Sequence, residues 1–288
     1  MYKIGYVGLG SMGFKMSVML MQKGFEVIGF NRTKSKEEEL AKMGASRVAS
    51  LVELAETCDV IMACLPDDNV IRQTIFGEQG LLKSPNPRFK YFIDCSTIDV
   101  DAAVDIGAKL KEKDIYYFDS PVSGGPKAAE SGTLTLMVGG DKDALDKVMP
   151  VYNAIGTNIL YFGPNGSSTQ VKLINQILAW VNHAVICEAA VLAKKAGMDL
   201  DKMYDALITS FGASRVLEVT FKTKIQHEDY TNPTGMAMMY KDLTLAQKFA
   251  ERNGAIMPMT ETAMKLYSKA IADGHGNKDQ CIIMEQLK

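Results

Sequence analysis

Short apolar runs alternate with longer helical stretches along this chain, up to about residue 163. Helix-like segments such as SMGFKMSVMLMQKG and DVDAAVDIGAKLKEK lie between most of the runs. Near-continuous apolar strands that alternate with helices are typical of parallel strands buried on both faces. The pattern predicts an α/β fold with a doubly wound, mostly parallel sheet. The expected strands are KIGYVG, EVIGFN, DVIMACL, YFIDCS, IYYFDS, TLTLMVG and NILYFG.

The pattern changes after the turn at Gly163 to Gly166, because only helical periodicity follows it. Gly197, Gly254 and Gly274 stand where helices are expected to end. We therefore expect a first domain at residues 1–164 and an all-α domain at residues 165–288, which begins with a long helix. The other expected helices are DLDKMYDALITSF, YKDLTLAQKFAERNG and MTETAMKLYSKAIADG.

Composition excludes several classes of function. The formal charge of the 288 residues is −2 and charges of both signs are interspersed, which argues against a nucleic-acid partner. We find no run of about 18 apolar residues without charges, and a strand starts at Lys3, so we expect neither a membrane span nor a signal peptide.

The cysteines and histidines point to a reducing compartment and to no metal. The five cysteines lie mostly in apolar segments and are expected to be reduced, as in a cytoplasmic protein. There is no CxxC, and the three histidines are far apart in sequence. The sequence therefore predicts no metal site.

A glycine loop follows the first expected strand directly and precedes a helix. Gly8, Gly10 and Gly13 form GxGxxG, in which glycines allow a tight turn, close approach of a pyrophosphate and close helix packing. In this context the loop predicts a Rossmann-type dinucleotide site; the alternative is a glycine-rich turn without a ligand. The expected cofactor contacts in the loop are Gly8, Leu9, Gly10, Ser11, Met12 and Gly13.

The end of the second strand bears on the choice of cofactor. An NAD site usually has an acidic residue here for the ribose 2′-hydroxyl, but this chain has Asn31, Arg32 and Thr33. An arginine suits a 2′-phosphate, and Lys34 and Lys36 follow closely. The acidic run at residues 37–39 comes too late and is expected on the next helix. We favour NADP, with NAD as the alternative; a solvated basic corner without a ligand is also possible.

Three further strand ends should meet at the ligand edge of the sheet. Leu65-Pro66 and Ser96-Thr97 could line the cofactor with backbone and hydroxyl groups. Ser123-Gly124-Gly125 lies in the segment that begins at Asp119, and its backbone N–H groups could bind an anion. From spacing alone this segment could equally be an ordinary turn.

The long helix at 166–197 carries Lys172 and Asn175 three residues apart in an apolar stretch, with Gln176 beside them. A buried ammonium is costly unless it is paired or neutral. This face fits a helix whose first turns line a cleft, so Lys172 is a candidate proton donor. His183 is its rival, although we expect His183 to be a core residue.

The motifs together resemble the β-hydroxyacid dehydrogenase family, which includes 3-hydroxyisobutyrate dehydrogenase, tartronate semialdehyde reductase and related semialdehyde reductases. The matches run along the whole chain in the family's order. They are GYVGLGSMG at 5–13, LP at 65–66, DCST at 94–97, DSPVSGGPKAAESGTLTLMVGG at 119–140, GPNGSSTQVKLINQ at 163–176 and YKDLTLA at 240–246.

The resemblance implies roles for single residues. Lys172 matches the family's catalytic lysine, and Asn175 matches the amide that positions the substrate. Residues 123–125 match the segment that holds the substrate carboxylate, Thr97 and Leu65-Pro66 match cofactor contacts, and Lys241 matches a lysine that reaches the cofactor. The resemblance also implies a Rossmann domain followed by an all-α domain, and a homodimer or homotetramer.

At two places this chain departs from the family pattern, and these departures bear on the cofactor and the substrate that the resemblance implies. The NAD-using members tend to carry an acidic residue where Asn31-Arg32 stands, which supports NADP. The segment 210–215 lacks the tryptophan-containing pattern of the hydroxyisobutyrate enzymes, which puts that substrate in doubt; Arg215 is either a second anion contact or a surface charge. We expect reduction of a small carboxylate-bearing semialdehyde, with Thr97 also near the substrate. The alternatives are an imine reductase, against which Lys172 argues, and a non-catalytic nucleotide-binding module.

Overall fold

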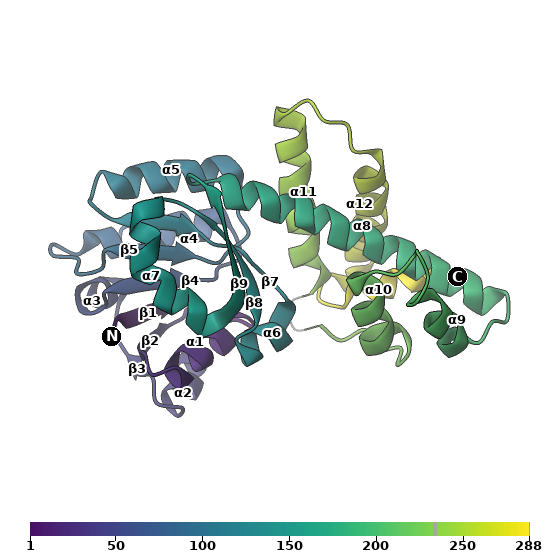
Figure 1. Ribbon diagram of the computed structural model, residues 1–288, viewed down its shortest axis with the longest axis horizontal. Coiled ribbons are helices and arrows are strands. Elements are labelled where there is room, and N and C mark those ends of the chain that lie inside the picture. Colours follow the sequence, from purple (N-terminus) through teal and green to yellow (C-terminus); the bar gives the residue numbers. More distant parts are fainter. Residues whose placement is uncertain (233–234, 288) are drawn as a thin grey trace. The chain divides into compact units, whose positions relative to one another are not determined.

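A computed structural model describes residues 1–232 and 235–287. The chain divides into two compact units, Met1–Lys172 and Leu173–Lys288 (Figure 1). The long helix α8 (Ser167–Lys195) starts in the first unit and continues into the second.

The first unit is built on one sheet. Within residues 1–172, all of which the structure describes, nine strands follow the order β3-β2-β1-β4-β5-β6-β8-β7, and β9 pairs with β8. The pairs from β3 to β6 are parallel, whereas β8 runs antiparallel to β6 and β7. This confirms the predicted mostly parallel sheet. The strands are β1 (Lys3–Val7), β2 (Glu26–Phe30), β3 (Ser46–Arg47), β4 (Val60–Ala63), β5 (Tyr91–Asp94), β6 (Tyr116–Asp119), β7 (Val122–Ser123), β8 (Leu134–Gly139) and β9 (Gly156–Gly163).

The sheet is buried on both faces, as its continuous apolar strands predict. One core cluster includes Met62 and Ile93 and is closed by α1, α6 and α7. The other includes the alternate residues Ile61 and Phe92 and is closed by α3, α4 and α5. The helices of this unit are α1 (Gly13–Gln22), α2 (Lys34–Ala41), α3 (Leu51–Thr57), α4 (Asp68–Phe76), the 3₁₀ turn η1 (Leu81–Lys83), α5 (Val100–Lys111), α6 (Gly125–Ser131) and α7 (Lys142–Ile155).

The sequence did not predict β3 and β7, which are two residues long each. Neither has the run of apolar residues that identifies a buried strand. The acidic run at residues 37–39 does lie on the next helix, α2, as expected.

The second unit is helical, and in its described residues the only β-pairing is an isolated bridge between Thr231 and Lys278. Its core gathers apolar side chains of several helices, among them Tyr204, Phe221 and Tyr267. Besides α8 the elements are α9 (Leu200–Leu207), α10 (Arg215–Thr220), the π-helix η2 (Phe221–Ile225), α11 (Met236–Arg252), α12 (Pro258–Ala270), the π-helix η3 (Ile271–His275) and the 3₁₀ helix η4 (Gln280–Gln286).

The predicted helix ends are confirmed at Gly197 and Gly254, which follow α8 and α11 with φ of +71° and +68°. Gly274 has φ of +86° inside η3, where it interrupts the helical geometry four residues after the end of α12. The helix expected over DLDKMYDALITSF ends earlier, at Leu207. The hydroxyls of Thr209 and Ser210 donate to the carbonyl of Ala206, and such bonds compete with continued helix.

By its length and composition alone, helix α8 could cross a membrane, although the sequence predicted no membrane span. Of its most apolar stretch of 18 residues, 44% is buried. Core helices of soluble proteins can have the same length and composition.

Candidate active site

The glycine loop between β1 and α1 has the geometry of a phosphate cradle. Gly8 has φ of +93°, and a Cβ there would overlap the carbonyl oxygen of Cys64. A Cβ at Gly13 would overlap the carbonyl oxygen of Gly8, so this glycine is needed for the helix to pack on the loop. At Gly10, by contrast, a Cβ would meet no protein atom within 4 Å. The loop therefore leaves open space at the glycine where a pyrophosphate should approach the backbone.

Asn31, at the end of β2, holds this loop in place. Its side-chain oxygen accepts a hydrogen bond from the backbone N–H of Leu9 at 2.9 Å, and its side-chain nitrogen donates to the carbonyl of Thr33 at 3.1 Å. Its backbone N–H donates to Glu37 at 2.7 Å. An asparagine in place of the usual acidic residue thus ties the second strand to the glycine loop.

Of the charged side chains near Asn31, some are paired within the described first unit with a charge of opposite sign and one is not. The buried carboxylate of Glu37 pairs with Lys34 at 2.8 Å, and Glu39 pairs with Lys36 at 2.7 Å. Arg32 is exposed, and within residues 1–172 no hydrogen bond or ion pair holds its guanidinium. Of the three cations at residues 32–36, Arg32 is therefore the one without a carboxylate partner in this unit, whereas Lys34 and Lys36, the two lysines expected to assist it, are both paired.

The ends of β4 and β5 are joined by hydrogen bonds. The backbone N–H of Leu65 donates to the hydroxyl of Ser96 at 2.8 Å, and the backbone N–H of Ser96 donates to Asp94 at 2.9 Å. Tyr117 donates its hydroxyl to the same carboxylate at 3.0 Å. Burial raises the pKa of Asp94 to about 6, although these hydrogen bonds oppose the shift. Leu65-Pro66 and the half-buried Thr97 therefore lie on neighbouring segments at one edge of the sheet.

Lys172 is buried, with 7% of its surface exposed, and its Nζ donates to the carbonyl oxygen of Val122 at 2.9 Å. Val122 immediately precedes Ser123. The fold thus brings the proposed proton donor to the segment that was predicted to bind the substrate carboxylate, although the two are 50 residues apart in the chain.

That segment is shaped by two glycines with positive φ. Gly124 has φ of +127° and Gly125 of +70°, and a Cβ at Gly125 would meet nothing within 4 Å. Ser123 is half-buried in β7. The segment therefore has a backbone path that favours glycine at both positions, with open space beside Gly125.

A buried carboxylate, Asp119, holds the start of α8. It accepts hydrogen bonds from the backbone N–H groups of Gly166 and Thr169 at 3.0 and 3.1 Å. The hydroxyls of Ser168 and Thr169 donate to it at 2.5 and 3.1 Å, and Asn165 donates at 3.3 Å. A carboxylate at a helix N-terminus satisfies N–H groups that have no partner inside the helix. Because Lys172 lies one turn further on, Asp119 sets the position from which the lysine reaches Val122.

In the second unit, the candidates Asn175 and Lys241 are linked by a chain of polar contacts. Asn175 donates to the side-chain oxygen of Gln176 at 3.0 Å, and Gln176 donates to Asp242 at 2.5 Å. Lys241 forms an ion pair with the other oxygen of Asp242 at 3.0 Å. The fold thus connects two residues that the sequence predicted for substrate and cofactor, through two buried residues for which it predicted no such role.

Arg215 is the first residue of α10, after Ser214, whose hydroxyl accepts from the backbone N–H of Leu217 at 3.0 Å. Its side chain is exposed, and none of the described residues holds it by a hydrogen bond or ion pair. The structure places it with none of the other candidates within the second unit.

Sequence reasoning missed Asp119 as an N-terminal acceptor and Asp242 as the partner of Gln176. A signal existed for the first, since the helix start Gly-Ser-Ser-Thr offers donors that need a buried acceptor. It also missed a cluster of His183, Cys187 and Cys281, because Cys281 lies 98 residues from His183 in the chain.

Known proteins with similar sequences also bind a nicotinamide dinucleotide, as the family models that match this chain show. Residues 3–163 match the model of the NAD binding domain of 6-phosphogluconate dehydrogenase, and residues 166–287 match that described as NAD-binding of NADP-dependent 3-hydroxyisobutyrate dehydrogenase. The chain is 30% identical to 2-(hydroxymethyl)glutarate dehydrogenase of Eubacterium barkeri, over 98% of this chain and 94% of that one. It is 32% identical to 2-hydroxy-3-oxopropionate reductase of Escherichia coli, over 99% and 97%.

Among solved structures, 3-hydroxyisobutyrate dehydrogenase from Salmonella typhimurium superposes with a TM-score of 0.90 at 29% identity, covering 99% of this chain and all of that one. The fold and the glycine loop define an NAD(P)-dependent oxidoreductase that acts on CH–OH groups. The chain belongs to the β-hydroxyacid dehydrogenase family.

Proposed function

We propose that this protein uses NADP(H) to reduce a small semialdehyde that carries a carboxylate to the corresponding hydroxyacid, and to run the reverse reaction, with Lys172 as proton donor and acceptor. Residues 1–164 hold the cofactor, and residues 165–288 complete the substrate site and the oligomer. The observation that carries the proposal is the 2.9 Å bond from Lys172 Nζ to the carbonyl of Val122, next to Ser123.

The cofactor is held by the glycine loop and by segments at the ends of neighbouring strands. The open space at Gly10 fits the pyrophosphate, and Arg32 is the cation that selects a 2′-phosphate. Lys241 is a further proposed cofactor contact. The other contacts are Gly8, Leu9, Ser11, Met12, Gly13, Asn31, Thr33, Leu65, Pro66 and Thr97.

The substrate carboxylate binds at Ser123, Gly124 and Gly125, with Thr97 beside it and Arg215 as a further anion contact. Asn175 orients the reacting end. A small carboxylate-bearing substrate agrees with the names of the relatives, such as 2-hydroxy-3-oxopropionate reductase. The polar chain through Gln176 and Asp242 keeps the amide of Asn175 in one orientation.

In the reduction, negative charge builds on the aldehyde oxygen while the carbonyl carbon accepts a hydride, which the bound nicotinamide supplies. Lys172, as ammonium, stabilises this charge and gives a proton to the oxygen. In the oxidation, neutral Lys172 accepts the proton of the alcohol. Acid–base help of this kind contributes about 10²–10⁴-fold to the rate. The contact with Val122 holds the amine in place before the substrate binds, which avoids reorganisation during the reaction.

We further propose that the protein forms a homodimer or homotetramer through α8. Ile174, Leu178, Val185 and Leu192 are 50%, 64%, 54% and 70% exposed. Their spacing of four and seven residues puts them on one face of the helix, and such an apolar stripe is what a second helix packs against. Light scattering on the purified protein should give a mass of two or four chains. A monomer at micromolar concentration would contradict the proposal, and Leu178→Lys should weaken the association.

The test of the activity is a substrate panel under steady-state conditions. Glyoxylate and the semialdehydes of succinate, methylmalonate and tartronate are offered with NADPH and, separately, with NADH. We expect consumption of NADPH with at least one semialdehyde. Turnover only with a cyclic imine or with an aldehyde plus an amine would indicate an imine reductase, and NADPH binding without turnover on any substrate would indicate a binding module. Either result contradicts the proposed function.

A further inference from the structure

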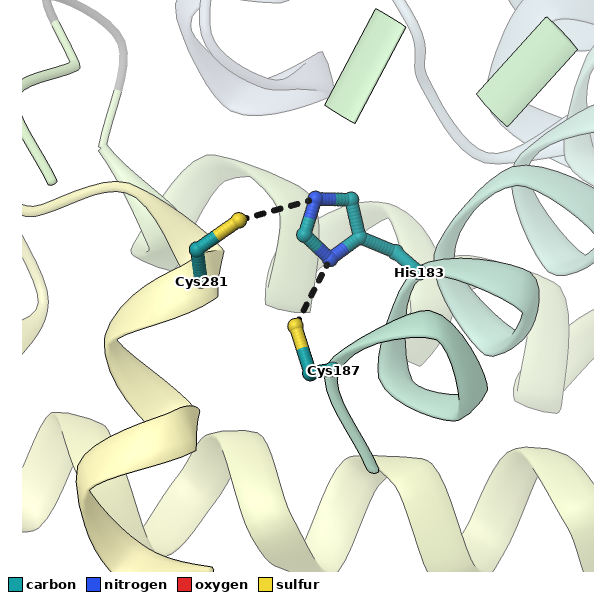
Figure 2. A group of neighbouring side chains, drawn as sticks. All are labelled: His183, Cys187 and Cys281. Carbon is teal, nitrogen blue, oxygen red and sulfur yellow. Dashed lines mark hydrogen bonds between the residues drawn. The ribbon is translucent and has the colours of Figure 1, made fainter. Parts of the chain in front are cut away.

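A cluster of three potential metal ligands lies in the core of the second unit (Figure 2). His183 and Cys187 are one turn apart on α8, and Cys281 comes from η4. All three side chains are buried, with 2%, 0% and 0% of their surfaces exposed. One nitrogen of His183 and the two sulfur atoms lie within 4.8 Å of one another.

The hydrogen bonds of this cluster are poor for a buried imidazole. Nδ1 of His183 contacts the sulfur of Cys187 at 3.7 Å, and Nε2 contacts the sulfur of Cys281 at 3.7 Å. Among the described residues no oxygen or nitrogen atom bonds to either ring nitrogen. Thiols are weak donors and acceptors, whereas buried polar groups are normally well satisfied. His183 is therefore a buried polar side chain whose two partners are weak hydrogen-bonding groups but good metal ligands.

We propose that His183, Cys187 and Cys281 bind a divalent cation of the Zn²⁺ type. Two cysteines and one histidine are a ligand set that Zn²⁺ uses in proteins, because thiolate and imidazole are its preferred donors. The metal would join α8 to η4 and so stabilise the second unit. This role is independent of the proposed reaction, which uses Lys172.

The charge balance of the site favours a divalent ion. On binding, each thiol releases one proton, so that two thiolates and a neutral imidazole surround one dication and the buried complex is uncharged. A charged complex would be costly in this apolar core.

The distances require one local change. Zinc bond lengths of about 2.0 Å to nitrogen and 2.3 Å to sulfur put tetrahedral ligand atoms about 3.5–3.8 Å apart. The nitrogen–sulfur contacts of 3.7 Å already match this spacing, but they involve different nitrogens of the ring (Figure 2). The imidazole must turn about its Cβ–Cγ bond so that one nitrogen faces both sulfurs.

The test measures metal content in the full-length protein. The wild type is unfolded, refolded with Zn²⁺ under reducing conditions, freed of loose metal by gel filtration and analysed by mass spectrometry of the metal. We expect about one equivalent per chain, and a charge-transfer absorption typical of thiolate–cobalt bonds when Co²⁺ replaces Zn²⁺. Cys281→Ala and Cys187→Ala should lose both signals. Cys58→Ala, which changes a buried cysteine of the first unit, should keep them.

Several results would overturn the proposal. These are wild-type protein that refolds without retaining zinc, cobalt protein without the charge-transfer band, or an unchanged zinc content in Cys281→Ala. The protein purified with zinc present is also analysed by mass spectrometry. A disulfide between Cys187 and Cys281 in this protein would show that the two thiols are oxidised and do not bind the metal. If a variant does not fold, the zinc and cobalt measurements on the wild type still test the proposal. None of these measurements depends on enzymatic activity.

Discussion

Asp119→Asn is expected to destabilise the protein strongly, because the carboxylate accepts five hydrogen bonds at the start of α8. One oxygen takes those of Asn165 and Gly166, and the other takes those of Ser168 and Thr169. The side-chain amide of asparagine can replace either oxygen. In one orientation its NH₂ group faces the backbone N–H of Gly166, and in the other it faces that of Thr169.

Either orientation leaves one buried backbone N–H without an acceptor, which costs about 1–3 kcal/mol. The loss of charge-assisted hydrogen bonds to the remaining donors adds to this, while the hydroxyls can rotate and accept from the amide. We therefore expect a total loss of about 2–4 kcal/mol in the free energy of unfolding. The charge on its own cannot explain such a loss, since the variant removes a buried charge, which by itself would be favourable.

The assay is equilibrium unfolding in urea, with Asp141→Asn as the matched control. Asp141 caps α7 through one hydrogen bond, to the backbone N–H of Ala144 at 2.9 Å, and asparagine caps a helix about as well as aspartate. The control should therefore change stability by no more than about 0.5 kcal/mol. If Asp119→Asn costs no more than Asp141→Asn, the five hydrogen bonds do not hold α8 as described.

Three further predictions concern Arg32 after β2, Gly10 in the glycine loop and the buried Asp94. Arg32→Asp should weaken NADPH binding about 10–100-fold and NADH binding far less, measured by fluorescence titration; equal losses would remove the argument for NADP. Gly10→Ala should fold normally yet bind cofactor at least about tenfold more weakly, because its Cβ meets only the open space; unchanged affinity would show that no pyrophosphate lies there. The raised pKa of Asp94, about 6 against 3.8, means that its contribution to stability is present below pH 3.8 and is lost as the pH rises through 6. The stability of wild type relative to Asp94→Asn should therefore fall by about 2–3 kcal/mol between about pH 4 and pH 7, and a constant difference would contradict the shift.

The sequence predicted the sheet and the cofactor loop because their signals are local. Apolar runs identify strands that are buried on both faces, and GxGxxG identifies the turn that Gly8 and Gly13 require. The helix ends at Gly197 and Gly254 were predictable for the same reason, since a positive φ favours glycine.

The contacts that hold the site together were not predictable in this way. They join residues far apart in the chain, such as Lys172 with Val122 and Gln176 with Asp242. Periodicity places a polar residue on a face of a helix, but it does not say which distant carbonyl or carboxylate will meet it. The cluster of His183, Cys187 and Cys281 could not be predicted for the same reason, because η4 and α8 are distant in the sequence and meet only in the folded chain.

In the proposed mechanism the amine of Lys172 transfers the proton during reduction. The direct measurement is the rate of a single turnover by stopped flow, with NADPH and the preferred semialdehyde at saturation, for wild type, Lys172→Ala and the exposed control Lys142→Ala. We predict that Lys172→Ala binds NADPH with wild-type affinity but transfers hydride about 10²–10⁴-fold more slowly, while the control is unchanged. A folded Lys172→Ala protein that turns over at close to the wild-type rate would contradict the account.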